Sequence, residues 1–275
     1  MRSRAICLTL FLLLAVAHAQ FGGRRGPPGR VPDFDRGSVP QWELRPSFKE
    51  DCFTFARIKY RSSAPERSSY AWWTDYPAAD LNLSWRLHQL TSMSVHPDGK
   101  FVEILDPKLF DYPFLFMSGV PNIEVSEEEV RTLRRYLLNG GFMMVDDFWG
   151  EANWDHFYRE VVKRVLPDRE PEELPLAHPI FHCVFDLKEK PQIPNVGHAM
   201  RFRGTGITWE VPDGKTPHYR GVTDVKGRLM MLICHNTDNG DGWEEEATDP
   251  YYFTEFSEKK AYPLGINILF YVMTH

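Results

Sequence analysis

The sequence is poor in cysteine and in basic residues. Only four cysteines occur among 275 residues, too few for a disulfide-dense mini-protein, and none has the spacing of a Cys/His zinc site. Acidic residues outnumber basic ones and give a net charge of −6, so a nucleic-acid partner is not expected. With 43% hydrophobic and 25% charged residues, the composition is that of a globular protein, not of a disordered or collagen-like chain.

Long hydrophobic runs are also lacking. The apolar run from Ala5 to Ala17 is shorter than the ~20 residues that a membrane-spanning helix needs. Two arginines precede it, and it ends in Ala17-His18-Ala19, the pattern of a cleaved signal peptide. We expect residues 1–19 to be a signal peptide, and the mature protein to be secreted or periplasmic with no transmembrane segment. An uncleaved anchor at the membrane interface is the alternative.

The remaining chain divides into a tail and one domain. Residues 20–48 are rich in glycine, proline and arginine, which predicts a disordered tail. Over residues 49–275, runs typical of strands alternate with runs typical of helices, as in a layered α/β domain. Strands are predicted at 53–60, 101–105, 112–117, 142–145 and 228–234, and helices from about Pro77, Ser126 and Asn153 and at the C-terminus.

The segment that begins at Ser126 gives the clearest prediction. Ser126 and Glu129 have the spacing of a capping box, and Val130, Leu133 and Leu137 recur on one face of the helix that follows. Because strands precede and follow this helix, right-handed parallel crossovers are expected. Beyond this unit, glycine and proline interrupt residues 200–225, which predicts several short strands there.

Five short segments, in order along the domain, form a recognisable set. They are Phe53-Thr54-Phe55-Ala56-Arg57, Trp73-Thr74-Asp75-Tyr76-Pro77-Ala78-Ala79-Asp80, the Tyr136–Asp147 run with its Gly-Gly, His178-Pro179-Ile180-Phe181 and Gly265-Ile266-Asn267. Together they resemble the DUF4159 family, a bacterial domain family without an assigned activity. The resemblance implies a flavodoxin-like, glutamine amidotransferase-like fold: a three-layer sandwich with a mostly parallel central sheet and a β-rich C-terminal insertion. It brings no catalytic residues with it.

The resemblance to amidotransferases can be tested on their nucleophile. In that fold, a cysteine stands on the tight turn between a strand and a helix. The equivalent turn here, Asp146–Gly150, holds neither cysteine nor serine, so glutaminase activity is not expected. Cys234 and His235 cannot replace it as a dyad, because adjacent residues of a strand point to opposite faces.

Polar side chains follow three predicted strands: Asp75 and Asp80 follow the first strand across a loop, Asp147 follows 142–145, and His235 and Asp238 follow 228–234. Ligands of open α/β sheets bind beyond the carboxyl ends of the strands, so we expect one acidic crevice at this edge. Crowded carboxyl groups repel one another, and at least one should have a raised pKa unless a cation neutralises them. The alternative is a set of unrelated caps and turns, with Asp75 as a helix N-cap. The candidate residues are Asp75, Asp80, Asp147, Trp149, His235 and Asp238.

Two details of this acidic edge stay open in the sequence. If strand geometry continues through Asp146 and Asp147, their side chains diverge and only one of them faces the crevice. Residues 235–244 are rich in oxygen-bearing side chains, as in a calcium loop. Gly240 departs from the EF-hand pattern, however, so a plain polar turn is the alternative.

The histidines and cysteines give weaker patterns. His178 and His182 are four residues apart, but the proline between them disfavours a paired zinc face on a helix. In an oxidising compartment one disulfide could form among the three cysteines of the mature chain, and three buried, unpaired thiols are the alternative. These cysteines are Cys52, Cys183 and Cys234.

Two functions from different classes fit these patterns. The first is a non-catalytic module of the cell envelope that binds a small molecule, a carbohydrate or a protein partner. The second is a metal-assisted hydrolase acting on a carbohydrate or cell-wall substrate, with tryptophans beside the acidic loops to hold a sugar. Convergence of the acidic loops and the metal content of the protein would separate the two; the sequence assigns no cofactor and no catalytic residue.

The signal-peptide pattern predicts the first residue of the mature protein. After expression in a bacterial host, intact-mass analysis should find a chain that begins at Gln20, because cleavage follows the small residue at position 19. An unprocessed chain in the membrane fraction would contradict this prediction.

Overall fold

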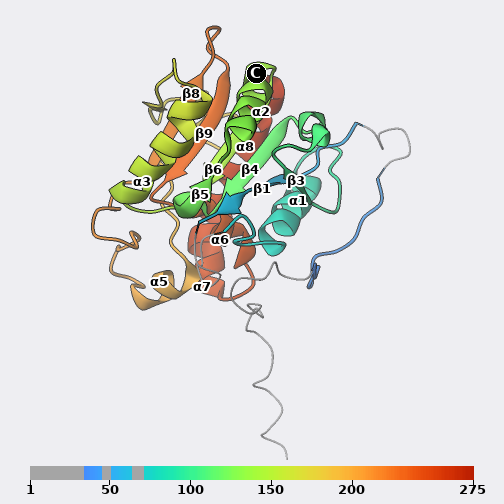
Figure 1. Ribbon diagram of the computed structural model, residues 1–275. Helices are drawn as coiled ribbons and strands as arrows, with labels where there is room; N and C mark the ends of the chain where they lie inside the picture. The colour runs from blue at the N-terminus through green and yellow to red at the C-terminus, as the bar shows by residue number, and fades with distance from the viewer. Residues whose placement is uncertain (1–33, 45–50, 64–70) are drawn as a thin grey trace, which may run out of the picture.

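The computed structural model describes residues 34–44, 51–63 and 71–275. The predicted signal peptide, residues 1–19, lies outside the described residues. A seven-stranded sheet runs through the centre of the domain in the order β3-β1-β4-β6-β9-β8-β7 (Figure 1). Its strands are β1 (Ala56–Lys59), β3 (Lys100–Glu103), β4 (Phe114–Ser118), β6 (Phe142–Asp146), β7 (Glu172–Glu173), β8 (His218–Thr223) and β9 (Leu229–His235).

Most of the sheet is parallel. Strands β3, β1, β4, β6 and β9 pair in parallel, whereas β8 pairs antiparallel with both β9 and β7. The predicted hairpin turn before residue 228 is confirmed: it joins β8 to β9, and Gly227 has a φ of +84°. A separate two-stranded sheet pairs β2 (Arg61–Ser62) with β5 (Ile123–Glu124). The predicted α/β class with a mostly parallel central sheet is therefore confirmed.

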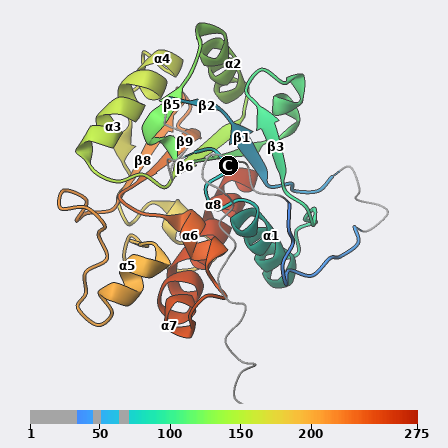
Figure 2. The same cartoon turned by 60° about the horizontal axis from the view of Figure 1, so that its bottom comes forward.

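Helices cover both faces of the sheet and enclose two apolar cores. One core joins the sheet to α1, α6 and α8, and the other joins it to α2, α3 and α4 (Figure 2). Successive strand residues alternate between the cores: Phe116 and Met144 face the first, and Met117 and Val145 the second. The helices are α1 (Ala78–Leu90), α2 (Glu127–Leu138), α3 (Glu151–Phe157), α4 (Lys163–Val165), α5 (Val196–Arg201), α6 (Asn239–Glu244), α7 (Pro250–Tyr252) and α8 (Tyr262–Thr274).

Helix α2 forms as its sequence predicts. The Ser126 hydroxyl accepts a hydrogen bond from the Glu129 N–H, and the Glu129 carboxylate accepts one from the Ser126 N–H. Gly140 follows the helix with a φ of +108°, a conformation that glycine adopts without a steric penalty. The stripe that includes Leu133 is buried against β6 and α4.

Two predictions about irregular segments are wrong. Residues 202–217 form turns and loops, and β8 is the one strand within 200–225. Polar and glycine-rich turns take the place of the expected strands. This described segment is therefore not β-rich. The disordered tail predicted over 20–48 does not extend to residues 34–44, which contact the domain. Trp42 stacks on His88 of α1 at 4.6 Å, and its indole N–H donates to the Val95 carbonyl at 2.8 Å.

Among the residues that the structure describes, no helix combines the length and the apolar character that crossing a bilayer requires. The other notable segments are two π-helical turns, Tyr158–Val162 after α3 and Phe253–Ala261 before α8.

The buried stripe of α2 predicts the effect of one truncation. Leu133→Ala should lower the free energy of unfolding by ~2–5 kcal/mol, because it leaves a cavity in the core. Leu138→Ala is the matched control: that side chain lies on the same helix but is 55% exposed, so the change should be within about 0.5 kcal/mol. Urea denaturation of both variants checks this, and equal losses would contradict it.

Candidate functional site

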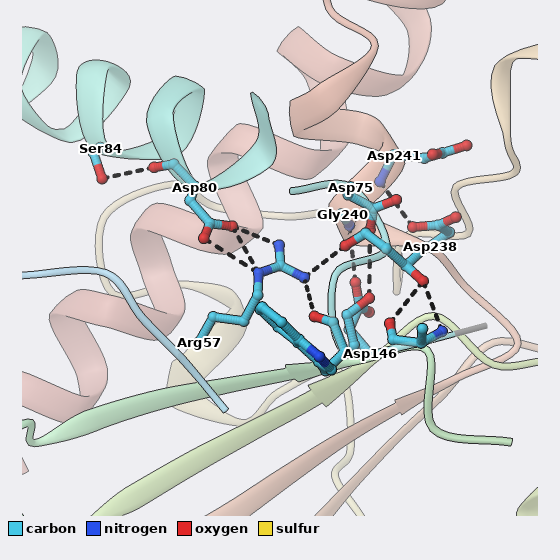
Figure 3. Close-up of polar contacts among 12 residues, drawn as sticks. Arg57, Asp75, Asp80, Ser84, Asp146, Asp238, Gly240 and Asp241 are labelled. Carbon is cyan, nitrogen blue, oxygen red and sulfur yellow. Dashed lines mark hydrogen bonds and ion pairs between the residues drawn. The ribbon is translucent and has the colours of Figure 1, made fainter. Parts of the chain in front are cut away.

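Five aspartates gather beyond the carboxyl ends of β4, β6 and β9. Ser118 ends β4 and pairs in register with Asp146, which ends β6. The Ser118 hydroxyl donates to Oδ2 of Asp75, which precedes α1, at 3.4 Å. The loop after β9 and the start of α6 bring two more aspartates to the same place (Figure 3). The five, named here the aspartate cluster, are Asp75, Asp146, Asp147, Asp238 and Asp241.

Asp146 ties the sheet to helix α6. Its side chain is completely buried and accepts hydrogen bonds from Nδ2 of Asn239 at 2.7 Å and from the N–H of Gly240 at 2.9 Å. At position 240, a Cβ would lie 2.1 Å from Oδ2 of Asp75. Only glycine therefore lets the first turn of α6 approach the carboxylates this closely. Gly240, which departs from the EF-hand pattern, is thus required by the packing of the carboxylates.

Three carboxylates are close enough to share an ion. One oxygen each from Asp75, Asp238 and Asp241 lies within 4.8 Å of the others. Asp238 also caps α6, because it accepts a hydrogen bond from the Asp241 N–H at 2.8 Å. These three residues and Asp147 are only 4–8% exposed.

Left-handed backbone positions the cluster. Asp75, Asp147 and Asn236 have φ values of +66°, +58° and +62°, which aspartate and asparagine adopt more readily than other side chains. At Asp147 this conformation ends the strand alternation, so Asp146 and Asp147 both lie in the cluster and raise each other's energy when ionised. The condition under which only one of this pair would face the site, continued strand geometry, is therefore not met. Asp75 has a positive φ and does not cap α1, whose N-cap is Pro77.

Burial and mutual repulsion raise the pKa of every member of the cluster. Burial raises the pKa of Asp146 to about 7, opposed by its hydrogen bonds from Asn239 and Gly240. Burial also raises the pKa of Asp75 to about 6, although Arg57 lowers it. The pKa values of the other three lie well above the usual range, because burial is reinforced by neighbouring carboxylates. The cluster is therefore short of positive charge.

Asp80 lies beside the cluster but is neutralised by its own partner. Arg57 of β1, which is fully buried, donates from Nε at 3.1 Å and from Nη2 at 2.5 Å to the Asp80 carboxylate. The same guanidinium donates to the carbonyls of Trp72 and Thr74. Losing one partner of such a buried pair typically costs ~3–5 kcal/mol. Asp80 thus has a structural role in this arrangement and is not available to a ligand.

His235 and Trp149 lie apart from the aspartates with which the sequence groups them. His235 is buried between the rings of Phe148 and Trp154, with its Nε2 3.1 Å from the carbonyl of Gly150. Burial lowers its pKa to about 4. Trp149 is buried beside Gly214. His235 is still part of β9 and pairs with His218 of β8, whereas Asp238 is the N-cap of α6. Trp149 lies between the left-handed Asp147 and the start of α3.

The remaining sequence patterns have local structural roles. His178 accepts a hydrogen bond from the Ile180 N–H, and His182 contacts Asp186, so these histidines do not face a common ion. Sγ of Cys183 donates to the Asn267 carbonyl, whereas Cys234 is buried in β9, and no disulfide joins these two. Residues 235–244 comprise the last residue of β9, a short connection and the capped helix α6.

Sequence reasoning misses three contributors to the site. The sequence patterns identify Asp146 only as a neighbour of Asp147, and Asp241 only as part of a polar loop. They miss the Arg57 side chain altogether, although an arginine in a predicted buried strand signals a buried carboxylate partner.

The chain belongs to the family described as "Domain of unknown function (DUF4159)", whose family model matches residues 54–273. A comparison with curated proteins gave no match. The resemblance seen in the sequence motifs is therefore confirmed at the level of the family.

The raised pKa values predict how stability depends on pH in protein treated with a chelator. Each carboxyl group binds its proton more tightly in the folded state than in the unfolded chain, so the free energy of unfolding should fall as pH rises from about 4 to 8. Each tenfold difference in proton affinity between the two states contributes about 1.4 kcal/mol. Urea denaturation at several pH values measures the slope.

Two variants make this measurement specific. Asp146→Asn should flatten the slope between pH 5 and 8, because it removes one of the groups with a raised pKa. Asp111→Asn, at an exposed aspartate of the same chain, should keep the slope of the unaltered protein. Stability that rises with pH over this range in the chelated protein would contradict the prediction.

Proposed function

We propose that this member of the DUF4159 family is a secreted or periplasmic module of the cell envelope that binds its ligand through a divalent cation held by the aspartate cluster. The observation that carries the proposal is the convergence of five buried carboxyl groups, whose mutual repulsion a cation would relieve. The signal-peptide pattern supports the location in the cell envelope.

Electrostatics supports a cation in the cluster. An isolated buried carboxylate is so unfavourable that it is protonated unless a cation or several hydrogen bonds stabilise it. Arg57 is already engaged by Asp80, and the two short hydrogen bonds from Asn239 and Gly240 serve Asp146. A divalent ion would neutralise two carboxylates at once and lower the pKa values of the others.

The donor set is that of a hard cation. Ca²⁺ and Mg²⁺ are bound by carboxylate and carbonyl oxygens, with ~2.3–2.6 Å to Ca²⁺ and ~2.0–2.1 Å to Mg²⁺. The spacing of Asp75, Asp238 and Asp241 suits the larger ion with little movement. A neutral oxygen lies next to the cluster: Oδ1 of Asn239, whose Nδ2 binds Asp146, is buried and has no hydrogen-bond donor within the described part of the chain.

The strand order supports a flavodoxin-like fold. Numbered along the chain, the five parallel strands β1, β3, β4, β6 and β9 lie in the order 2-1-3-4-5, the order of flavodoxin-like proteins. Such proteins bind ligands at the switch point between the first and third parallel strands, here β1 and β4. Ser118, at the carboxyl end of β4, and its neighbour Asp75 belong to the proposed cation site.

Binding is better supported than hydrolysis of a carbohydrate. A bound cation with an open coordination position would hold a carboxylate or hydroxyl group of a small molecule, a carbohydrate or a cell-envelope protein. Trp72, Trp149 and Trp243 are buried and Trp73 is partly buried, which does not favour an exposed platform of tryptophans on which a sugar stacks. The hydrolase alternative retains one supporting feature, the raised pKa of Asp147 beside the proposed ion, which suits a general acid or base.

The proposal predicts opposite effects of one substitution with and without metal. Asp241→Asn should raise the melting temperature of chelated protein at pH 8, because it removes one of several repelling charges. It should also abolish the stabilisation that Ca²⁺ gives the unaltered protein. For a bound ion at 100 times its Kd, that stabilisation is about 2.7 kcal/mol. Thermal denaturation in EDTA and in increasing CaCl₂ or MgCl₂ measures both effects.

Asp111→Asn, at an exposed aspartate, is the matched control and should respond to Ca²⁺ like the unaltered protein. If neither Ca²⁺ nor Mg²⁺ stabilises the unaltered protein, or if Asp241→Asn leaves the response intact, the cation site is wrong. Metal-dependent hydrolysis of a cell-wall polymer that Asp147→Asn abolishes would favour the hydrolase instead.

A further inference from the structure

A second group of potential ligands lies at the antiparallel side of the sheet. His218 begins β8 and His235 ends β9, and the two residues are directly paired across the strands with their rings 5.7 Å apart. Glu151, the first residue of α3, completes the group. One ligand atom from each of the three lies within 4.8 Å of the others. None of these residues belongs to the aspartate cluster.

Hydrogen bonds indicate which ring nitrogen of each histidine carries the proton and which keeps a lone pair. The Gly150 carbonyl can only accept, so Nε2 of His235, 3.1 Å away, carries the proton and Nδ1 keeps its lone pair. Nδ1 of His218 lies 3.0 Å from the Glu173 carboxylate and donates to it, which leaves the Nε2 lone pair. Metal-binding histidines are typically oriented in this way, by a carbonyl or a carboxylate on the other nitrogen.

Glu173 is itself held in place. Its carboxylate accepts hydrogen bonds from Lys190 and from the Tyr219 N–H, in addition to His218. These contacts hold the Glu173 carboxylate where it accepts a hydrogen bond from Nδ1 of His218. Glu173 thereby orients the His218 ring, as carboxylate partners of metal-binding histidines do.

We propose that Glu151, His218 and His235 form a Zn²⁺ site with an open coordination position. Two imidazole nitrogens and one carboxylate are the ligands of open zinc sites in which a fourth position remains for water or another ligand. Imidazole also selects Zn²⁺ over Ca²⁺ and Mg²⁺, which prefer oxygen. The inference is independent of the cation proposed for the aspartate cluster.

Arg220 reaches into the same group of residues. Its Nη1 donates to Nδ1 of His235 at 3.0 Å, and its guanidinium lies 4.0 Å from the ring centre of Trp154. Zinc would replace this hydrogen bond, and the guanidinium charge opposes the entry of a cation. Arg220 therefore lowers the affinity of the site for Zn²⁺. Its side chain also lies where it can bind an anionic ligand of the metal.

The test is isothermal titration of untagged, chelator-treated protein with ZnCl₂ in the presence of saturating CaCl₂, which fills the aspartate cluster. The unaltered protein should bind one Zn²⁺, and Co²⁺ at the same site should show the visible absorption of a four- or five-coordinate ion. His218→Gln, a change at a partly exposed residue, should weaken Zn²⁺ binding at least tenfold. His182→Gln, which alters a histidine outside the group, should leave binding unchanged.

Arg220→Met separates metal binding from a purely structural network. Removal of the competing donor and of its charge should tighten Zn²⁺ binding at least tenfold, whereas a role confined to packing predicts no gain. Absence of Zn²⁺ binding by folded protein, or equal affinities of the unaltered protein and His218→Gln, would overturn the proposal. The Ca²⁺ response of Asp241→Asn is measured separately, so failure of one site is distinguishable from failure of the other.

Discussion

The buried charge at the carboxyl edge of the sheet is the constraint on which the surrounding structure depends. Asp146 holds the start of α6 through Asn239 and Gly240, and Asp238 caps the same helix. Helix α6 in turn brings Trp243 into the core between the sheet and α8. The carboxylates that repel one another are thus also the groups that join β6, β9 and α6. Their repulsion cannot be relieved by moving them apart without loss of these contacts.

Two neighbouring groups of buried carboxyl residues at this edge of the sheet differ in how their charge is balanced. The Arg57–Asp80 pair is internally neutral, and the guanidinium also satisfies two backbone carbonyls. Within the described part of the chain, the aspartate cluster beside it forms no such ion pair, and burial raises the pKa values of its carboxyl groups. A neutral pair needs no further component, whereas an acidic group binds protons or a cation. This contrast between neighbouring sites distinguishes a structural ion pair from a candidate binding site.

The two candidate metal sites differ in chemistry and in position. The aspartate cluster offers oxygen atoms from the carboxyl ends of parallel strands, and suits hard cations. The group of Glu151, His218 and His235 offers mainly nitrogen, and lies where the antiparallel β8 adds to the parallel sheet. One end of the sheet thus presents two donor sets that different ions would prefer. The long loop between α5 and β8 contacts residues close to both sites: Asp213 accepts a hydrogen bond from the Glu151 N–H, and the Thr216 carbonyl accepts one from Nδ2 of Asn236.

The sequence by itself determined the local elements and the edge of the sheet at which polar residues collect. The capping box and apolar stripe of α2, the buried strand β6 and the hairpin before β9 follow from short-range preferences of the backbone and from burial, which neighbouring residues encode. Only the tertiary structure decided which polar residues meet. Asp147 lies beside Asp146 because its backbone is left-handed, Asp80 of α1 pairs with Arg57 of β1, and His235 pairs with His218 across β8 and β9. Such contacts depend on pairings between distant segments and on single backbone angles, and no local pattern of the sequence specifies either.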